Sequence, residues 1–341
     1  MVAKRCFVIA EAGVNHNGAL DLALKLVDAA ADAGADAVKF QTFKAERLVA
    51  RGTPTAAYQA TNTGATDQHA MLASLELAES AYPALLERCK GRGIEFMSTP
   101  FDGDSARLLA GHGVRRIKVG SGDVTSLAFL EEIAALTLPV ILSTGMSTLD
   151  EVAEAVDTFA GAWGKVGEKL TLLHCTSNYP AREEDVNLRA MRTLHERFGL
   201  PTGYSDHTQG TSVAVAAVAL GATVLEKHLT LDRGMPGPDH RASLDPPTFA
   251  RMVRELREVE AALGSAVKAP AASELAVRDV VRRSVALRRS LRQKDVIRKE
   301  DLTLLRPGTG IAPRELARVV GRRAAHDLEA GVLLKWSDLL P

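Results

Sequence analysis

Polar side chains follow the ends of eight short apolar runs in this sequence. Two of them are lysines, Lys39 and Lys118. A lysine in a buried strand is costly to desolvate unless a carboxylate or a bound anion faces it. Ammonium and hydroxyl groups together supply the donors that a phosphate or carboxylate ligand requires. Hydroxyl side chains end three of the other runs, at Thr99, Ser143 and Ser205, and Ser121 follows the same run as Lys118.

The two lysines have three interpretations on the residues alone. They can clamp a phosphate or a carboxylate, or one of them can form a Schiff base with a carbonyl substrate. They can also be structural and close the rim in pairs with Glu11 and Glu226. The neighbouring hydroxyls favour the clamp over the Schiff base, because a phosphate needs many donors.

Histidines at two neighbouring run ends indicate a metal site or hydrogen-bonded core residues. His207 and His228 could hold Mn²⁺, Zn²⁺ or Fe²⁺ together with water or a carboxylate. His174 and Cys175 also form a pair that looks like metal ligands. Adjacent strand residues face opposite ways, so the two cannot reach one site, and we expect Cys175 to pack in the core.

A stiff loop follows the eighth run. Pro236, Gly237 and Pro238 hold Asp239 at a defined place. Asp239 is then either a solvated turn residue or an acceptor for a substrate hydroxyl near the site.

The apolar runs alternate with amphipathic helical segments up to about residue 263, which predicts an α/β fold with parallel strands. Eight such units match a (β/α)8 barrel, whose active site lies at the C-terminal ends of the strands. The segment after the first run is not a glycine-rich phosphate loop, which disfavours a doubly wound sheet. Predicted helices include 20–33, 104–110, 149–159 and 211–220, with Gly34, Gly113 and Gly221 as C-terminal caps. The predicted strands are 6–10, 37–40, 95–98, 116–119, 140–143, 170–174, 202–204 and 223–227.

The composition changes after this barrel domain, which we place at residues 1–263. A linker rich in Ala, Ser and Pro follows at 264–281, and a small, mainly β domain at 282–341 has short runs at 284–287, 302–305 and 332–334. Residues 278–341 hold 15 basic and 8 acidic residues, a net charge of +7, which leaves −7 for the rest. A domain of this size is marginal alone, so we expect it to dock onto another surface.

The whole chain has 42 basic and 42 acidic residues, so its net charge is zero and a nucleic-acid binder is disfavoured. The small domain has one aromatic residue, Trp336, and so lacks stacking platforms for single strands. The longest nearly apolar stretch of the whole chain, residues 213–225, is too short to span a membrane. The N-terminus reads as a first strand, not a signal peptide. Three scattered cysteines exclude a disulfide framework and fit a reducing cytoplasm.

Long motifs along the chain resemble those of the sialic acid (N-acetylneuraminate) synthases, a family that includes legionaminic and pseudaminic acid synthases. The C-terminal stretches RPGTGI (306–311) and VVGRRAAHDLEAGVLL (319–334) are similar to the family's antifreeze-like (SAF) domain. The resemblance covers nearly all of the chain. The barrel motifs are EAGVNHNG (11–18), KFQTF (39–43), STPFD (98–102), KVGSGD (118–123), STGM (143–146), HCTSNYP (174–180), YSDHT (204–208), EKHLTLDR (226–233) and PGPDH (236–240).

The resemblance implies an enzyme that condenses phosphoenolpyruvate with an N-acyl hexosamine and releases phosphate. It also implies a divalent metal, Mn²⁺ before Mg²⁺ or Co²⁺, bound by His207 and His228, with Glu11 near its water. A domain-swapped homodimer is implied, in which each small domain caps the partner's barrel. The sugar would contact Gln41, Asp123, Tyr179, Asp239 and Arg306 of the partner subunit. The phosphoenolpyruvate ligands would be Lys39, Thr99, Lys118, Ser121, Ser143, Ser177 and Ser205.

Two positions depart from the N-acetylneuraminate-specific pattern. Asp123 stands where those members carry Glu, and Ser177-Asn178 stands where some members place Asn first. The shorter acid leaves space for a bulkier sugar such as a 2,4-diacetamido hexose. N-acetylmannosamine and this relative therefore both stay open as acceptors, and a Schiff-base aldolase on the same barrel is the more distant alternative.

Overall fold

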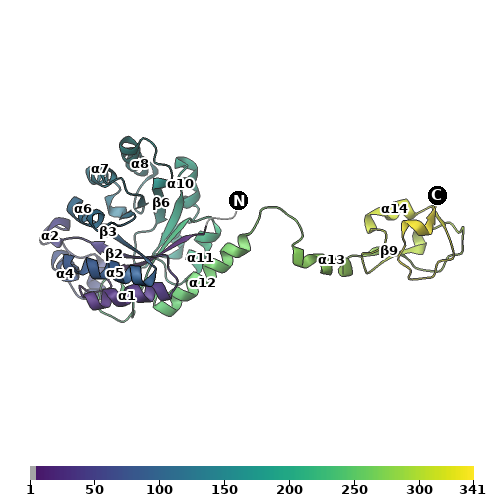
Figure 1. Cartoon of the computed structure of the whole chain (residues 1–341), viewed down its shortest axis with the longest axis horizontal. Helices are drawn as coiled ribbons and strands as arrows, with labels where there is room; N and C mark the ends of the chain where they lie inside the picture. The colour runs from purple at the N-terminus through teal and green to yellow at the C-terminus, as the bar shows by residue number, and fades with distance from the viewer. Residues whose placement is uncertain (1–4) are drawn as a thin grey trace. The chain divides into compact units, whose positions relative to one another are not determined.

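The structure, a computed structural model, describes residues 5–341, apart from the side chains of Tyr58 and Glu168. The chain folds as two compact units, Met1–Gly264 and Ser265–Pro341 (Figure 1). Strands and helices alternate throughout the first unit. None of the helices within 5–341 combines the length and apolar character needed to cross a bilayer.

The first unit is an eight-stranded sheet of parallel strands in the order β3-β2-β1-β8-β7-β6-β5-β4. The two end strands, β3 and β4, also contact each other, so the sheet curves into a nearly closed barrel. This confirms the predicted (β/α)8 fold. The strands are β1 (Phe7–Gly13), β2 (Ala37–Thr42), β3 (Glu95–Pro100), β4 (Ile117–Val119), β5 (Val140–Ser143), β6 (Leu170–Cys175), β7 (Thr202–Asp206) and β8 (Val224–His228).

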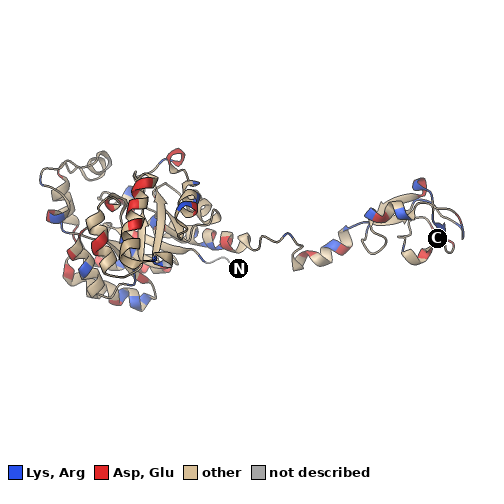
Figure 2. Ribbon diagram, turned by 90° about the horizontal axis from the view of Figure 1, so that it is seen from above, with Lys and Arg blue, Asp and Glu red and all other residues tan. Residues whose placement is uncertain are grey.

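Helices surround the strands, with their charged residues spread over the outer surface (Figure 2). Their apolar faces, such as Leu26 and Val27 of α1, pack in one core with outward-facing strand residues such as Val8 and Val38. The crossover helices are α1 (Leu20–Asp32), α5 (Tyr82–Arg92), α6 (Gly103–Gly111), α7 (Leu127–Ala135), α8 (Leu149–Trp163), α9 (Glu183–Val186), α10 (Ala190–Phe198), α11 (Ser212–Ala219) and α12 (Pro246–Leu263).

An excursion between β2 and α5 carries three further helices: α2 (Ala45–Leu48), α3 (Ala57–Thr63) and α4 (Gln68–Leu75). A separate apolar cluster anchors this excursion to the segment that follows β1. The cluster consists of Val14, Phe43, Met71 and Leu75. Asn62 Nδ2 donates to the carbonyl of Pro238, 2.7 Å away, which ties α3 to the loop after β8. The excursion therefore lies beside the C-terminal ends of the strands.

The barrel interior is built in layers, because every second residue of a strand faces inward. The lower layer is apolar and consists of Ile9, Ala37, Met97, Ile141, Leu173 and Val224. Two residues further along the same strands come Glu11, Lys39, Thr99, Ser143, Cys175 and Glu226. The same strand parity that fills the core thus places a polar layer directly above it.

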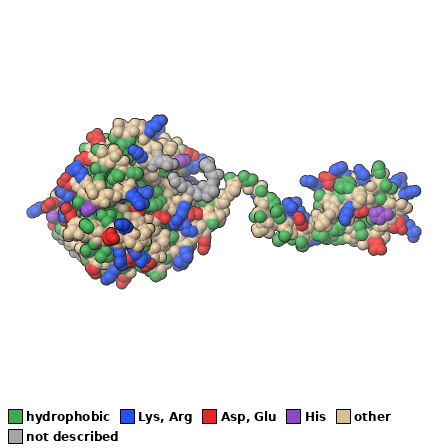
Figure 3. All heavy atoms as spheres, in the orientation of Figure 1, with side chains coloured by type: hydrophobic (Ala, Val, Ile, Leu, Met, Phe, Trp, Pro, Cys, Tyr) green, Lys and Arg blue, Asp and Glu red, His purple; other side chains and the backbone are tan. Residues whose placement is uncertain are grey.

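The second unit is small and loop-rich, and Lys and Arg side chains are prominent on its surface (Figure 3). Its core contains Val285, Leu287, Ile297 and Leu334. Helix α13 packs against the loop that follows β10, because the Gly308 amide donates to the Asp279 carbonyl at 2.8 Å. The elements are α13 (Leu275–Val281), β9 (Ser284–Leu287), β10 (Leu302–Leu305), α14 (Leu316–Val319), β11 (Arg323–Ala324) and β12 (Leu339–Leu340).

The predicted elements match the observed ones with shifts at their ends. All eight barrel strands occur, although β1 continues to Gly13, three residues past its predicted end. Gly34, Gly113 and Gly221 all have positive φ, as their capping role requires. The third short run of the small domain is not a strand, because Leu333 makes only an isolated bridge to Ala286.

Candidate functional site

A cavity of about 470 Å³ opens at the C-terminal ends of the barrel strands. Nearly all of the polar side chains that the sequence placed at these ends line it. A second cavity of the same volume lies at the opposite end of the barrel, but far fewer buried polar groups face it. The lining that matters for chemistry is Glu11, Lys39, Gln41, Thr99, Lys118, Ser121, Ser143, Cys175, Ser177, Tyr179, Ser205, His207, Glu226 and His228.

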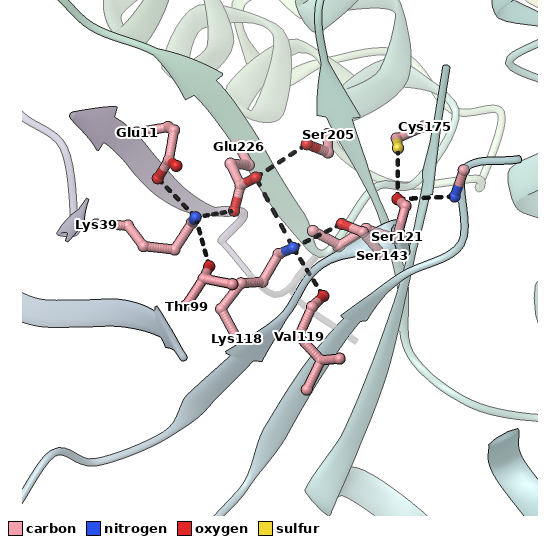
Figure 4. A network of polar contacts seen from close by, with 12 residues as sticks. Glu11, Lys39, Thr99, Lys118, Val119, Ser121, Ser143, Cys175, Ser205 and Glu226 are labelled. Atoms are coloured by element: carbon pink, nitrogen blue, oxygen red, sulfur yellow. Dashed lines mark hydrogen bonds and ion pairs between the residues drawn. The ribbon is translucent and has the colours of Figure 1, made fainter. Parts of the chain in front are cut away.

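Lys39 lies in the cavity with all of its donors engaged (Figure 4). Its Nζ is 2.6 Å from Glu11 Oε2, 3.0 Å from Thr99 Oγ1 and 3.7 Å from Glu226 Oε2. Burial alone would lower the pKa of Lys39, but the carboxylates of Glu11 and Glu226 raise it above its usual value. Lys39 is therefore a permanent ammonium.

Lys118 stands on the other side of Glu226 (Figure 4). Its Nζ donates to Ser143 Oγ at 2.7 Å and to the Val119 carbonyl at 3.0 Å, while Glu226 Oε1 is 3.9 Å away. Burial lowers the pKa of Lys118 because its carboxylate partner is more distant. The two lysines thus differ in how much of their charge the protein itself neutralises.

Two buried carboxylates share these ammonium groups. Burial raises the pKa of Glu11 to about 7, against the opposing effect of Lys39. Burial also opposes ionisation of Glu226, but Lys118 and Lys39 together hold its pKa well below the usual range. Glu226 is consequently an anion, whereas Glu11 can gain or lose a proton near neutral pH. Such a group suits proton transfer.

His207 and His228 lie close together, with ring centroids 5.5 Å apart. His207 Nδ1 is 2.7 Å from the Thr176 carbonyl, which only accepts, so Nδ1 carries the proton and Nε2 keeps its lone pair. Burial lowers the pKa of both histidines, so both are neutral. Nδ1 of His228 is buried and has no hydrogen-bond partner among residues 5–341. His207 Nε2 has one long contact, 3.5 Å from Ser205 Oγ, whose proton can go to Glu226 instead. Two neutral imidazoles with nitrogen lone pairs available in this way fit a divalent metal.

No third protein ligand completes such a centre within the described part of the chain, where no group of three or more His, Cys, Asp or Glu could hold a metal ion. Water or substrate oxygens would have to fill the remaining coordination positions. An open coordination shell of this kind is usual for a metal that acts on a substrate.

Four of the residues expected to contact a sugar, Gln41, Asp123, Tyr179 and Asp239, belong to the barrel unit, and two of them, Gln41 and Tyr179, line the cavity. Tyr179 stacks near the histidines, with its ring 4.2 Å from that of His207. Gln41 Nε2 donates to Glu11 Oε1 at 3.4 Å. Asp123 and Asp239 lie beside the cavity rather than in its lining, and burial raises the pKa of each to about 6. Arg306 belongs to the second unit, where it is exposed.

Sequence reasoning missed or misjudged several lining residues. The expectation that Cys175 packs in the core is wrong, because its Sγ lies 3.2 Å from Ser121 Oγ at the cavity wall. Strand parity could have shown this, since Cys175 follows the inward-facing Leu173 by two residues. The same parity brings Glu226 into the cavity. Gln59 and Gln68 come from the excursion of α3 and α4, which the sequence pattern did not reveal.

A (β/α)8 barrel whose mouth buries two ammonium groups, several hydroxyls and two neutral imidazoles defines an enzyme that acts on a multiply charged anion. Residues 26–268 match the NeuB family and residues 282–340 match the SAF domain, so the chain belongs to the NeuB family and carries a SAF domain. This confirms the family that the motifs resembled, and the chain is a NeuB-family synthase.

Known proteins similar to this chain include synthases of two sialic-type acids. An N,N'-diacetyllegionaminic acid synthase of Legionella pneumophila is 51% identical over 98% of this chain and 94% of its own. A protein of the same description from Campylobacter jejuni is 41% identical over 97% of this chain and 99% of its own. A crystal structure of an N-acetylneuraminic acid synthetase from Leptospira borgpetersenii, in complex with citrate, superimposes with a TM-score of 0.71. It is 37% identical and covers 80% of this chain and 90% of that one.

Proposed function

We propose that this chain condenses phosphoenolpyruvate with a 2,4-diacetamido-2,4,6-trideoxymannose to form N,N'-diacetyllegionaminic acid and phosphate. The observation that carries the proposal is the pair of buried lysines with hydroxyl partners in one cavity. The 51% identity to a legionaminic acid synthase favours this product over N-acetylneuraminate, the product named for the similar crystal structure at 37% identity. The short side chain of Asp123 also leaves room for the larger sugar.

The lysines and hydroxyls would bind the two anionic groups of phosphoenolpyruvate. Thr99 lies beside Lys39 and Ser143 lies beside Lys118, so each ammonium has a hydroxyl that can donate to the same anion. Ser121, Ser177 and Ser205 line the rest of the cavity. In this buried site the fixed charges would stabilise the phosphate as negative charge builds on it.

The reaction is balanced by one water molecule. Carbon 3 of phosphoenolpyruvate attacks the aldehyde carbon of the open-chain sugar, which forms the new carbon–carbon bond, and the aldehyde oxygen takes a proton. Water then adds to carbon 2, and the Glu11 carboxylate accepts its proton. Collapse of the tetrahedral intermediate breaks the bond between carbon 2 and the phosphate oxygen, which leaves the 2-keto acid and inorganic phosphate.

His207 and His228 would hold the divalent metal, Mn²⁺ before Mg²⁺ or Co²⁺. When bound there, a metal supplies Lewis-acid polarisation of the sugar's aldehyde oxygen. The hydrogen bond from His207 Nδ1 to the Thr176 carbonyl fixes the tautomer that leaves Nε2 available.

The sugar would lie toward Gln41, Asp123, Tyr179 and Asp239, and Arg306 of the partner subunit would reach its N-acyl group. A homodimer with exchanged small domains would bring Arg306 of the partner subunit to the sugar in this way. Opposite net charges on the acidic barrel and the basic small domain support such docking.

The test is phosphate release from phosphoenolpyruvate by the full chain with Mn²⁺. N-acetylmannosamine and 2,4-diacetamido-2,4,6-trideoxymannose are supplied in parallel, each with and without EDTA. We expect release that requires a sugar, is faster with the diacetamido sugar and stops with EDTA. No release with either sugar, together with a lysine trapped by borohydride and a carbonyl substrate, would instead establish the Schiff-base aldolase.

A further inference from the structure

Cys175 has an inward-facing thiol that the proposed reaction does not use. It ends β6 at the wall of the cavity and is 5% exposed. Its Sγ lies 3.2 Å from Ser121 Oγ and 3.7 Å from Ser177 Oγ. Figure 4 shows Ser121 between this sulfur and a backbone nitrogen, which is the amide of Gly145.

The backbone at Gly145 approaches these side chains closely. Its N–H donates to Ser121 Oγ at 3.0 Å. A Cβ at this position would come within 2.6 Å of Cys175 Sγ and closer still to Ser177 Oγ, so the approach requires glycine. Residues from the ends of β4, β5 and β6 therefore meet at one point on the cavity wall.

The direction of the Ser121 hydroxyl proton depends on which hydrogen bonds the hydroxyl oxygen already accepts. A hydroxyl has one proton to donate and two lone pairs that accept. The Gly145 amide occupies one lone pair. When the Cys175 thiol donates to the other, Ser121 has no further hydrogen-bond partner among residues 5–341, so its proton turns toward the cavity. Phosphate and carboxylate oxygens only accept, so a hydroxyl turned this way is a ready donor to them.

We propose that Cys175 is a positioning residue that orients the Ser121 hydroxyl as a donor to bound phosphoenolpyruvate. The inference rests on the proposed function, because it takes phosphoenolpyruvate to be the anion in this cavity. Cys175 itself touches no substrate in this arrangement and acts through Ser121. Cys175→Ser would keep a hydrogen-bond donor to the Ser121 oxygen, whereas Cys175→Ala would remove that donor.

The test is a double-mutant cycle on the full chain with Mn²⁺ present. The dissociation constant of phosphoenolpyruvate is measured by titration calorimetry without sugar, so that no turnover is needed. The variants are Cys175→Ala, Cys175→Ser, Ser121→Ala and the double variant Cys175→Ala/Ser121→Ala. Cys89→Ala is the matched control, because Cys89 is also a buried thiol but belongs to α5, outside the barrel.

We expect Cys175→Ala to weaken phosphoenolpyruvate binding about three- to tenfold, the range of one neutral hydrogen bond. Cys175→Ser should restore it to within about twofold, and the KM of the sugar should not change. In the Ser121→Ala background, Cys175→Ala should have no further effect, because the group through which it acts is gone. Cys89→Ala should bind as the parent does.

Two results would overturn the inference while leaving the proposed function intact. One is unchanged or tighter binding in Cys175→Ala, which would mean that Ser121 donates to the sulfur instead. The other is an equal loss with and without the Ser121 hydroxyl, which would show that Cys175 only packs. Failure of the parent chain to bind phosphoenolpyruvate would remove the proposed function itself.

Discussion

Lys118 is the less neutralised of the two cavity lysines, since its nearest carboxylate oxygen is 3.9 Å away against 2.6 Å for Lys39. It therefore has more charge available for a bound anion. We predict that Lys118→Met weakens phosphoenolpyruvate binding by about 10- to 100-fold, as expected for a charge-assisted hydrogen bond. Titration calorimetry measures this directly. Lys90→Met, at an exposed position on α5, is the control and should bind as the parent does.

The proton carried by Glu11 gives a prediction for the dependence of rate on pH. Burial raises the pKa of Glu11 to about 7, so its basic form appears only as the pH rises through that value. The histidine pKa values are lowered, so both imidazoles stay neutral in this range. We expect kcat/KM for phosphoenolpyruvate, which reports on the groups of the empty site, to rise with pH through about 7 and then level off. Glu11→Gln should lower kcat by about 10²- to 10⁴-fold and abolish this rise of the rate with pH. A profile that stays flat from pH 6 to 8 in the parent would exclude Glu11 as the base.

Strand parity accounts for most of the site at the scale of secondary structure. The apolar runs showed where the strands lie, and their order followed from the barrel fold. The pairing of the lysines with Glu226 was among the interpretations of the sequence, and period-two alternation could also have placed Cys175 inward. The helices α3 and α4 could not be predicted in this way, because Gln59 and Gln68 reach the cavity from a long excursion. Apolar contacts of Phe43 and Met71 and polar contacts such as that of Asn62 hold this excursion in place.

The barrel interior has one position where only glycine fits. A Cβ on Gly203 of β7 would lie 2.8 Å from Leu173 Cδ2 and would collide with the Val224 carbonyl. We predict that Gly203→Ala lowers the free energy of unfolding by at least about 1–3 kcal/mol. Denaturant unfolding measures the change.

The matched control is Gly161→Ala in α8, where a Cβ meets nothing within 4 Å. That substitution should leave stability unchanged or raise it by up to about 1 kcal/mol, since alanine favours a helix. Equal stability of the two variants would mean that β7 can move away from β8 without cost.

At the scale of the whole molecule, the proposed exchange of small domains can be tested by mixing two impaired chains and measuring activity at substrate concentrations well below the KM of each variant. Arg306→Ala should raise the KM of the sugar at least tenfold and leave phosphoenolpyruvate binding unchanged. Lys118→Met disables the barrel. If each site combines one barrel with the small domain of the other chain, refolding the two variants together should recover up to about a quarter of the parent activity.

That fraction follows because half of the randomly assembled dimers are mixed and each mixed dimer has one intact site. In the control, Arg314→Ala replaces Arg306→Ala and should keep the parent KM, because Arg314 is exposed on a short 3-10 helix (Pro313–Glu315) of the same unit. A co-refolded mixture of Arg306→Ala and Lys118→Met without activity would show that each small domain serves its own barrel.

The carboxylates that pair with Lys39 and Lys118 act before any substrate arrives. Glu11 and Glu226 are resident counterions, so part of the positive charge in the empty cavity is already neutralised before an anion arrives from solution. An entering phosphoenolpyruvate would compete with these carboxylates for the two ammonium groups, and the ion pairs would form again once phosphate leaves. Such ion pairs weaken the binding of substrate and product alike, which favours release of inorganic phosphate.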